Sequence, residues 1–141
     1  MPVQYRCNIL YTAFQTSYLK IFSNMTTKEV AARFAELARQ GQYDQIQDEL
    51  YAQNVRSIEA SEDFLPNVEG LDKVREKGKM FNEMVEAMHD GYCSDPVVGG
   101  DFFSCSMGMD VTLKGQGRIQ MDEIAVYGVK DGKIILEQFF Y

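Results

Sequence analysis

The sequence has few of the residues that build metal centres and disulfide frameworks. Its 141 residues include three cysteines, Cys7, Cys93 and Cys105, and a single histidine, His89. The cysteine count is odd and no two cysteines have Cys-x-x-Cys spacing, so we expect neither a disulfide framework nor a metal site. One histidine also leaves few routes to a Ser-His-acid or Cys-His pair. Acid or base chemistry must therefore come from carboxylates, tyrosines or His89.

The chain also lacks long apolar runs and clustered basic residues. It contains no stretch of about 18 apolar residues, so we expect no membrane span. The formal net charge is −7 and lysines and arginines form no cluster, which argues against a nucleic-acid partner. No Gly-rich phosphate loop or dinucleotide fingerprint is present, so we expect no cofactor. A reducing cytoplasm is the simplest location for a chain with unpaired cysteines.

The residues that are present are typical of one globular domain preceded by a different N-terminal stretch. A hydrophobic content of 45% is enough to form a core in a chain of this length. Residues 1–24 hold no acidic residue and lack the apolar segment and cleavage site of a secretory signal. A Thr-x-x-Glu capping box, Thr26 to Glu29, follows directly after Met25 and opens a helix. We therefore expect residues 1–24 to be an extension or a misplaced start, with a transit peptide as the alternative, and residues 25–141 to form the domain.

Periodic apolar residues predict three helices in the N-terminal half. The first runs over residues 27 to 40 and the second, shorter one over residues 43 to 51. The third helix is predicted over residues 71 to 88, where apolar residues recur at every third or fourth position. Between the second and third helices, residues 55 to 59 alternate as a strand does, and residues 61 to 70 are typical of a loop.

After Gly91 the apolar period changes to two. The turn signals Gly99-Gly100, Gly115-Gln116-Gly117 and Asp131-Gly132 divide this part into four strands. Connections this short join antiparallel neighbours. The sequence therefore predicts an α+β fold of order α-α-β-α-β-β-β-β, in which a strongly curved antiparallel sheet packs on the three helices around a pocket.

Three segments resemble a known superfamily: YAQNVRSIEA at residues 51–60, VEGLDKVREKGKMF at residues 68–81 and VYGVKDGKIILEQFFY at residues 126–141. Together with the element order they resemble the nuclear transport factor 2-like superfamily, specifically its SnoaL-like branch, over residues 25–141. The resemblance implies a cystatin-like cone, in which the sheet bends over its helices around an apolar cavity, and homodimers formed through the sheet. Members include polyketide cyclases, ketosteroid isomerases, dehydratases and non-catalytic binders, so the fold alone assigns no reaction.

By this resemblance, Glu59 occupies the position of a catalytic base. Ketosteroid isomerase-like members carry a carboxylate at the end of the first strand, in a segment with Tyr-Ala, six further residues and Asp. Residues 51–59 keep that spacing. Apolar surroundings would raise the pKa of such a carboxylate and let it move a proton beside a carbonyl group. The other interpretation of Glu59 is an exposed carboxylate at a strand end.

The other positions of the isomerase machinery do not match. Its oxyanion-binding tyrosine corresponds to Phe34 and its protonated aspartate to Ile124, and neither side chain can donate a hydrogen bond to an enolate. Steroid isomerisation is therefore not expected. Asp122, two residues before Ile124 on the same strand face, corresponds to the cavity aspartate of SnoaL-like cyclases. Glu59 and Asp122 would then be an acid and a base in one pocket, unless Asp122 is solvated near a turn.

The expected ligand is a small, largely apolar organic molecule, with carboxylate-dependent isomerase, cyclase or dehydratase chemistry. The predicted pocket wall consists of Phe34, Phe81, Phe103, Met107 and Ile124. His89, near the end of the third predicted helix, either interacts with the helix C-terminus or serves as a pocket donor. The alternative function is a non-catalytic dimeric module that binds a ligand or a protein through the outer face of the sheet. That outer face includes Phe102, Ser104, Ser106 and Asp110.

Overall fold

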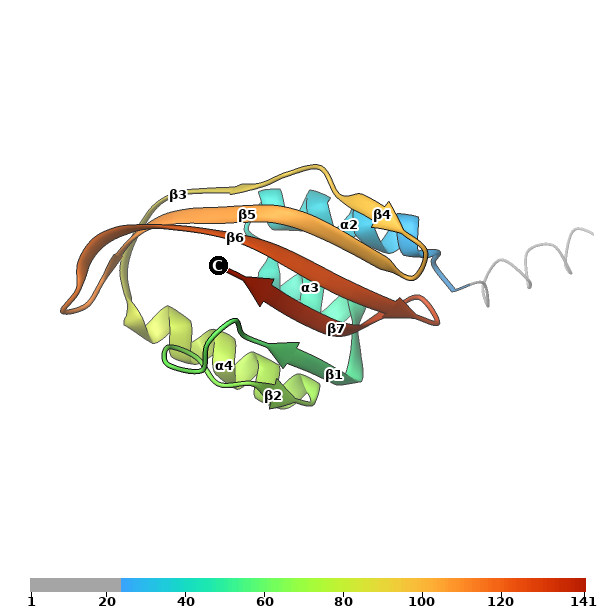
Figure 1. Ribbon diagram of the computed structural model, residues 1–141, viewed down its shortest axis with the longest axis horizontal. Helices are drawn as coiled ribbons and strands as arrows, with labels where there is room; N and C mark the ends of the chain where they lie inside the picture. Colours follow the sequence, from blue (N-terminus) through green and yellow to red (C-terminus); the bar gives the residue numbers. More distant parts are fainter. Residues whose placement is uncertain (1–23) are drawn as a thin grey trace, which may run out of the picture.

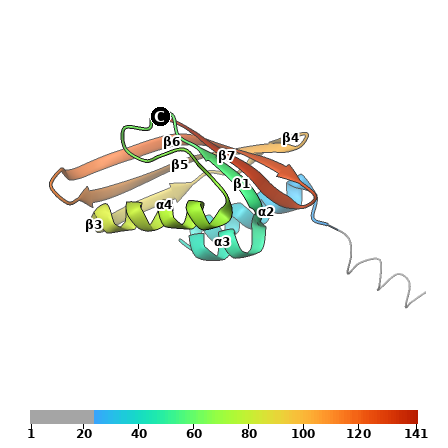
Figure 2. The ribbon, with the colours of Figure 1, turned by 90° about the horizontal axis from the view of Figure 1, so that it is seen from below.

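Helices cover one face of a seven-stranded sheet in the computed structural model, which describes residues 24–141. The helices of this part are α2 (Thr27–Arg39), α3 (Tyr43–Leu50) and α4 (Leu71–Met84). The strands are β1 (Tyr51–Ile58), β2 (Val68–Glu69), β3 (Val85–Cys93), β4 (Val97–Gly99), β5 (Phe102–Leu113), β6 (Gly117–Lys130) and β7 (Lys133–Phe140). Figure 2 shows all three helices on the same side of the sheet. The expectation for the N-terminal stretch falls on residues 1–23, which lie outside the described residues.

Helix α2 begins where the sequence predicts it. The Thr26 hydroxyl accepts a hydrogen bond from the Glu29 backbone N–H at 3.2 Å, and the Glu29 carboxylate accepts one from the Thr26 N–H at 2.7 Å. This capping box satisfies two N–H groups that the helix itself leaves without partners. On the opposite side of the helix, Val30, Phe34 and Leu37 are buried. The capping box therefore predicted the start of α2, and the amphipathic pattern predicted the face that it buries.

The third helix is shorter than predicted. Helix α4 ends at Met84, and Val85 already has an extended backbone with φ −77° and ψ 122°. The residues that follow form β3, which pairs antiparallel with β5. Pairing with β5 supplies the backbone hydrogen bonds that another helical turn would have made internally, so a long-range contact overrides the local apolar spacing. His89 consequently lies in a strand, and its predicted position at a helix C-terminus is wrong.

The glycine-containing turns connect antiparallel strands as predicted. Asp131 and Gly132 have positive φ angles of 50° and 73°. Lys130 pairs with Lys133, so these two residues form the whole β6–β7 connection, as in a type I′ turn. The β5–β6 hairpin turns at Gly115, where φ is 76°. The curved antiparallel sheet expected in the C-terminal half is therefore confirmed.

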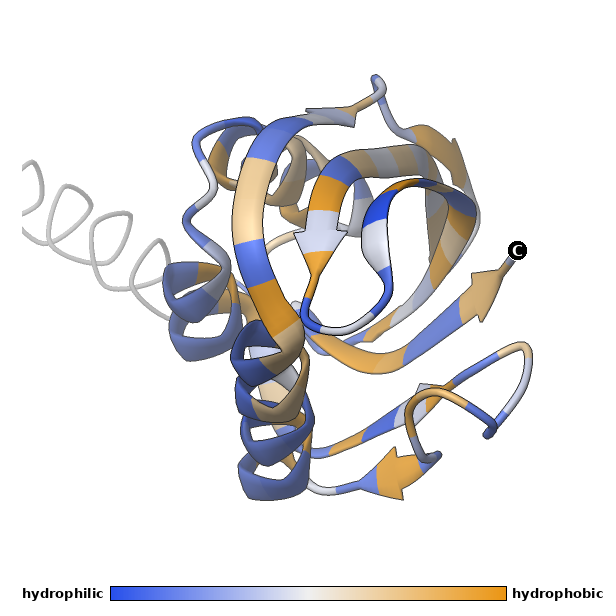
Figure 3. Ribbon diagram, turned by 90° about the vertical axis from the view of Figure 1, so that its left-hand side faces the viewer, coloured by the Kyte–Doolittle hydropathy of each residue, from blue (hydrophilic) through white to orange (hydrophobic). Residues whose placement is uncertain are grey.

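The strand order of the sheet is β2-β1-β7-β6-β5-β3, and β4 also pairs with β5. Strand β1 runs parallel to β7, whereas the other pairs are antiparallel. Register shifts occur in the β1–β7, β3–β5 and β6–β7 pairs, and such irregularities bend a sheet. Figure 3 shows the sheet curling around its concave side, and in Figure 1 the β5–β6 hairpin extends beyond the helices.

The core between α2 and the sheet is packed around three aromatic rings. The ring centroid of Phe34 lies 4.4 Å from that of Tyr127 and 5.5 Å from that of Phe103, and Phe103 and Tyr127 stack at 4.8 Å. The Tyr127 hydroxyl donates to the sulfur of Met107 at 3.5 Å. All four side chains are buried. Phe34, Phe103 and Met107, expected in the pocket wall, are thus packed against one another in the core.

Replacing Phe34 by alanine is expected to lower the free energy of unfolding by about 3–5 kcal/mol, because it empties the centre of this aromatic cluster. Phe81→Ala is the matched control, since Phe81 is only half-buried on α4, and its cost should be clearly smaller. Urea denaturation of the two variants and the wild-type protein measures both values. Equal losses would contradict the central position of Phe34 in the aromatic core.

Candidate functional site

Charged side chains gather on the concave face of the sheet, opposite α4. Glu59 directly follows β1, Lys77 lies on α4, Glu123 on β6 and Glu137 on β7. Lys77 and Glu137 are each only 6% exposed, and so is the side chain of Glu59. Charged groups are rarely buried to this extent unless they are paired. These four residues are called the interior charge cluster below.

Strand pairing explains why the carboxylates share one face. Residues that face each other across antiparallel strands point to the same side of a sheet. Glu123 lies opposite Met107 in the β5–β6 pair, and Glu137 lies opposite Tyr127 in the β6–β7 pair. Ser57, which is buried, lies beside Glu137 in the β1–β7 pair. Glu123 and Glu137 therefore lie on the same faces of their strands as the buried core residues.

Lys77 connects the helix to two of these strands. Its ammonium group forms an ion pair with Glu59 and donates a hydrogen bond to Ser57 Oγ at 2.6 Å. Ser57 Oγ donates in turn to Glu137 Oε1 at 2.5 Å, and the Tyr51 hydroxyl donates to the other oxygen of Glu137. The charge of Lys77 is thus balanced inside the protein, and two of its three N–H donors have partners.

Burial and neighbouring charges raise the proton affinity of two carboxylates in the cluster. The pKa of Glu123 rises from 4.5 to about 7, first through burial and then through the negative charges of Glu59 and Glu137, against the opposing charge of Lys77. The pKa of Glu137 is also raised by burial, although its hydrogen bonds from Ser57 and Tyr51 and the charge of Lys77 oppose the rise. A carboxyl group with a pKa near neutrality can both accept and donate a proton at physiological pH.

Glu59 is held from a second side by the last residue of the sequence. The Tyr141 hydroxyl lies 3.2 Å from Glu59 Oε2 and 3.3 Å from the carbonyl oxygen of Ser61, and can donate to either. The backbone N–H of Glu59 donates to Asn67 Oδ1 at 2.7 Å. These contacts tie the loop after β1 to the end of β7 and orient the Glu59 carboxylate toward Lys77.

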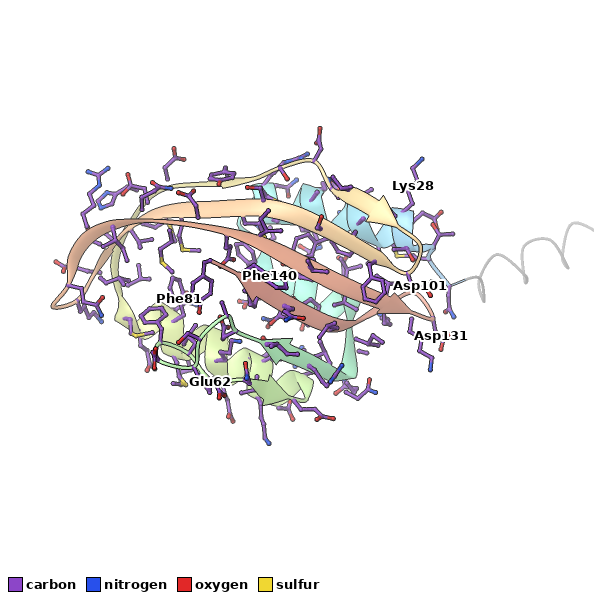
Figure 4. The ribbon with its side chains drawn as sticks, in the orientation of Figure 1. Lys28, Glu62, Phe81, Asp101, Asp131 and Phe140 are labelled. Carbon is purple, nitrogen blue, oxygen red and sulfur yellow. The ribbon has the colours of Figure 1, made fainter. Side chains whose placement is uncertain are left out.

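Apolar side chains accompany the charges. The Lys77 ammonium nitrogen lies 5.4 Å from the ring centroid of Phe139. Phe81 projects from α4 on the side that faces the sheet (Figure 4), and its ring meets that of Phe64 edge-on with 6.3 Å between centroids. Phe64, Phe81 and Phe139 are half-buried. A site with such surroundings suits a ligand with an apolar body and one or two polar atoms.

The structure corrects the face predicted for Asp122 and Ile124. Both are exposed on the convex side of the sheet, and Ile124 is 51% exposed. There Asp122 accepts a hydrogen bond from the Tyr92 hydroxyl at 2.9 Å. The β5–β6 register pairs odd-numbered residues with odd-numbered residues, so Glu123 occupies the inward position. The prediction that Asp122 and Ile124 face the pocket is therefore wrong.

His89 does not belong to the site either. It is exposed on β3, and its Nε2 atom lies 2.7 Å from Thr112 Oγ1. Among the described residues no group of three or more histidine, cysteine or acidic side chains could hold a metal ion. No helix of that same part is long and apolar enough to cross a membrane.

Sequence reasoning overlooked Lys77, Glu123 and Glu137, although two of them left a signal. Lys77 follows Val74 by three residues and precedes Phe81 by four, so it is a lysine on the apolar stripe of a helix. Glu123 could have been found by counting back from the β5–β6 turn, which makes it the partner of inward-facing Met107. For Glu137 no local signal exists, because its buried position depends on β1 pairing with β7.

A family model described as the SnoaL-like domain matches residues 25–141. The chain belongs to the SnoaL-like family. A crystal structure from Mesorhizobium loti, assigned as a SnoaL-like polyketide cyclase, is 37% identical, covers 83% of this chain and 100% of its own, and superposes with a TM-score of 0.79. A search of the curated proteins found no match.

More distant structures share the fold of this SnoaL-like protein. An NTF2-like protein from Burkholderia thailandensis is 16% identical, with a TM-score of 0.69 and coverage of 82% of this chain and 90% of its own. TerC, crystallised with polyporic acid, is 15% identical, with a TM-score of 0.64 and coverage of 82% and 92%. These similarities confirm the predicted nuclear transport factor 2-like fold, and the family match confirms the SnoaL-like branch.

Glu123→Gln is expected to stabilise the SnoaL-like protein above pH about 7. Because the unfolded chain loses this proton at the ordinary glutamate pKa and the folded protein only near 7, wild-type stability falls as the pH rises between these values. Glutamine has no proton to lose. The free energy of unfolding of the variant should therefore exceed that of the wild type by an amount that grows across the same pH window to about 3 kcal/mol. Urea denaturation across this window measures the difference, with Glu76→Gln on the exposed side of α4 as control. A difference independent of pH would contradict the raised pKa.

Proposed function

We propose that this SnoaL-like protein binds a small, largely apolar organic molecule beside the interior charge cluster and moves a proton next to its carbonyl group. The observation that carries the proposal is Glu123, a carboxyl group with a pKa of about 7 in the field of a second, ion-paired carboxylate, Glu59. A carboxyl group whose pKa lies near neutrality can accept a proton and later return it. The reaction would be that of an isomerase, cyclase or dehydratase and would need no cofactor. Its relative assigned as a polyketide cyclase supports this class of chemistry.

The contacts suggest different roles for the two carboxylates. One oxygen of Glu59 meets Lys77 and the other meets Tyr141, so Glu59 serves as a fixed charge. That charge helps to raise the pKa of Glu123, which serves as the proton carrier. In its ionised form Glu123 takes a proton from the carbon beside the carbonyl group, and in its protonated form it returns the proton to the same ligand. Glu123 returns the proton that it took, so the reaction consumes no other reactant.

Glu123→Gln is expected to reduce proton exchange on a carbonyl ligand by about a hundredfold or more, because it removes the group that carries the proton. Nuclear magnetic resonance in D₂O can follow deuterium uptake beside the carbonyl group in a panel of cyclic and aromatic ketones. Asp122→Asn, on the convex face, is the matched control and should exchange at the wild-type rate. If Glu123→Gln exchanged as fast as the wild-type protein, the proposal would be wrong.

We also propose that the protein forms a homodimer through the outer face of the sheet. Phe102, Ile124 and Phe140 on β5, β6 and β7 are 51%, 51% and 50% exposed, and Ile124 pairs with Phe140 across the β6–β7 ladder. Large apolar side chains that adjoin on an exposed surface are typical of a protein contact. A second copy of the same face would cover them. This face also supports the alternative function, a non-catalytic dimeric module, which would dimerise without exchanging protons.

Ile124→Asp is expected to shift the protein from dimer to monomer, because it places a charge at the centre of the apolar face. Light scattering coupled to size-exclusion chromatography measures the mass of both forms. Met80→Asp is the control, since Met80 is 47% exposed on α4, away from the sheet face, and should leave the dimer intact. A monomeric wild-type protein would contradict the proposed dimer.

A cytoplasmic location is part of this proposal. Cys93 and Cys105 are both free and both buried in the described structure. Unpaired thiols are the usual state of cysteine in a reducing compartment.

A further inference from the structure

Lys77 occupies a buried position, where a charged side chain is unfavourable unless it is paired. It is the only basic residue among the buried residues of 24–141. Removing an ammonium group from water costs several kcal/mol, and well-packed apolar replacements of buried ion pairs are often as stable as the pair itself. The neighbouring stripe residues Leu71 and Val74 are apolar and buried, so packing alone would favour an apolar side chain here as well. The position of Lys77 therefore points to a role in the site.

The ammonium group of Lys77 is held in place before any ligand arrives. Ser57 accepts one of its hydrogen bonds, and the Ser57 hydroxyl is itself fixed by its bond to Glu137. Glu59 forms an ion pair with the same ammonium group. An ammonium group has three donors, and these two partners use two of them. A preoriented cation with one donor left can stabilise negative charge on a ligand without rearrangement.

By the resemblance to isomerases, two positions should carry hydrogen-bond donors to the oxyanion, and neither holds a donor in this chain. Phe34 is packed in the aromatic core, and Ile124 lies on the convex face. The Tyr51 hydroxyl already donates to Glu137. Lys77 is therefore the cationic donor that the described interior offers to a ligand oxygen.

We propose that Lys77 binds the carbonyl oxygen of the ligand and stabilises the negative charge that develops on it when Glu123 removes the neighbouring proton. The inference rests on the proposed function and assigns its substrate class, which is a carbonyl compound that ionises to an enolate. The C–H bond breaks, the proton moves to the Glu123 carboxylate, and the electron pair moves to the oxygen hydrogen-bonded to Lys77. When the proton returns to carbon, the electron pair returns with it, so no oxidant or reductant is required.

The surrounding carboxylates permit a negative charge at this position. Burial raises the pKa of Glu123 to about 7, which lowers the negative charge of this carboxyl group near neutral pH. Glu59 and Lys77 form an ion pair, so together they add little net charge. The Glu123 carboxylate loses its own negative charge as it takes the proton, so the developing oxyanion does not increase the net negative charge of the site.

Binding of a stable anion tests Lys77 without any turnover. Dinitrophenol is an anion at neutral pH and resembles an enolate, whereas dinitroanisole, its methyl ether, has the same body without the anionic oxygen. Equilibrium dialysis should show that the wild-type protein binds the phenolate at least about tenfold more tightly than the ether, the usual size of a charge-assisted hydrogen bond. Lys77→Met should lose this preference and still bind the ether. Lys79→Met, which removes the same charge from the exposed side of α4, should keep the preference.

A second variant separates binding from folding. Lys77→Met leaves Glu59 without its ion-pair partner, so Lys77→Met combined with Glu59→Gln removes the unpaired charge as well, and circular dichroism checks that both variants fold. A tenfold preference for the phenolate that persists in either folded variant would overturn the role of Lys77. That result would leave the proton-carrier role of Glu123 standing, because the ketone exchange assay tests it separately. If the wild-type protein bound neither probe, both the Lys77 inference and the proposed binding site would be overturned.

Discussion

The buried ion pair between Lys77 and Glu59 is the interaction on which the arrangement of the site depends. It joins α4 to the end of β1, and through Ser57 it extends to Glu137 on β7. A buried ammonium group must keep its partners, because an unpaired charge in the interior costs several kcal/mol. The helix is therefore tied to two strands that lie side by side only because β1 and β7 pair in parallel. The need of the Lys77 ammonium for buried partners thus accounts for the positions of Glu59 and Ser57 beside it.

The aromatic core and the interior charge cluster occupy different parts of the concave face. Beneath α2, the rings of Phe34, Phe103 and Tyr127 form a packed core. Opposite α4, the same strands carry carboxylates in place of apolar side chains. The desolvation that stabilises the aromatic core is also what raises the pKa of Glu123, since a carboxylate near it has little water to stabilise its charge. The core thus creates the conditions under which a carboxyl group can exchange a proton at neutral pH.

Membership of the SnoaL-like family identifies the fold and leaves the chemistry to the side chains. The resemblance to ketosteroid isomerases placed the oxyanion donors at Phe34 and Ile124, whereas the structure packs Phe34 in the aromatic core and exposes Ile124 on the convex face. The chain brings to the interior a lysine on α4 and a glutamate on β6 instead. In the proposed function, Glu123 carries the proton and Lys77 stabilises the charge on the ligand oxygen, because catalysis requires charge stabilisation where charge develops rather than one particular residue. The proposal therefore assigns enolate chemistry to groups that differ from those of the isomerases.

The sequence by itself determined the elements whose causes are local. The capping box at Thr26 predicted the helix start, the two-residue turn at Asp131 predicted the hairpin, and the apolar period of two after Gly91 predicted strands, because each depends on residues close in the chain. Tertiary structure decided the rest. Helix α4 gives way to β3 because β5 offers backbone partners, and Glu123 faces inward while Asp122 faces outward because the register of β6 on β5 sets its two faces. Glu59, Lys77 and Glu123 each left a signal in the sequence, but their assembly with Glu137 could not be read from local pattern, since the four residues come from elements that meet only after the sheet has closed on α4.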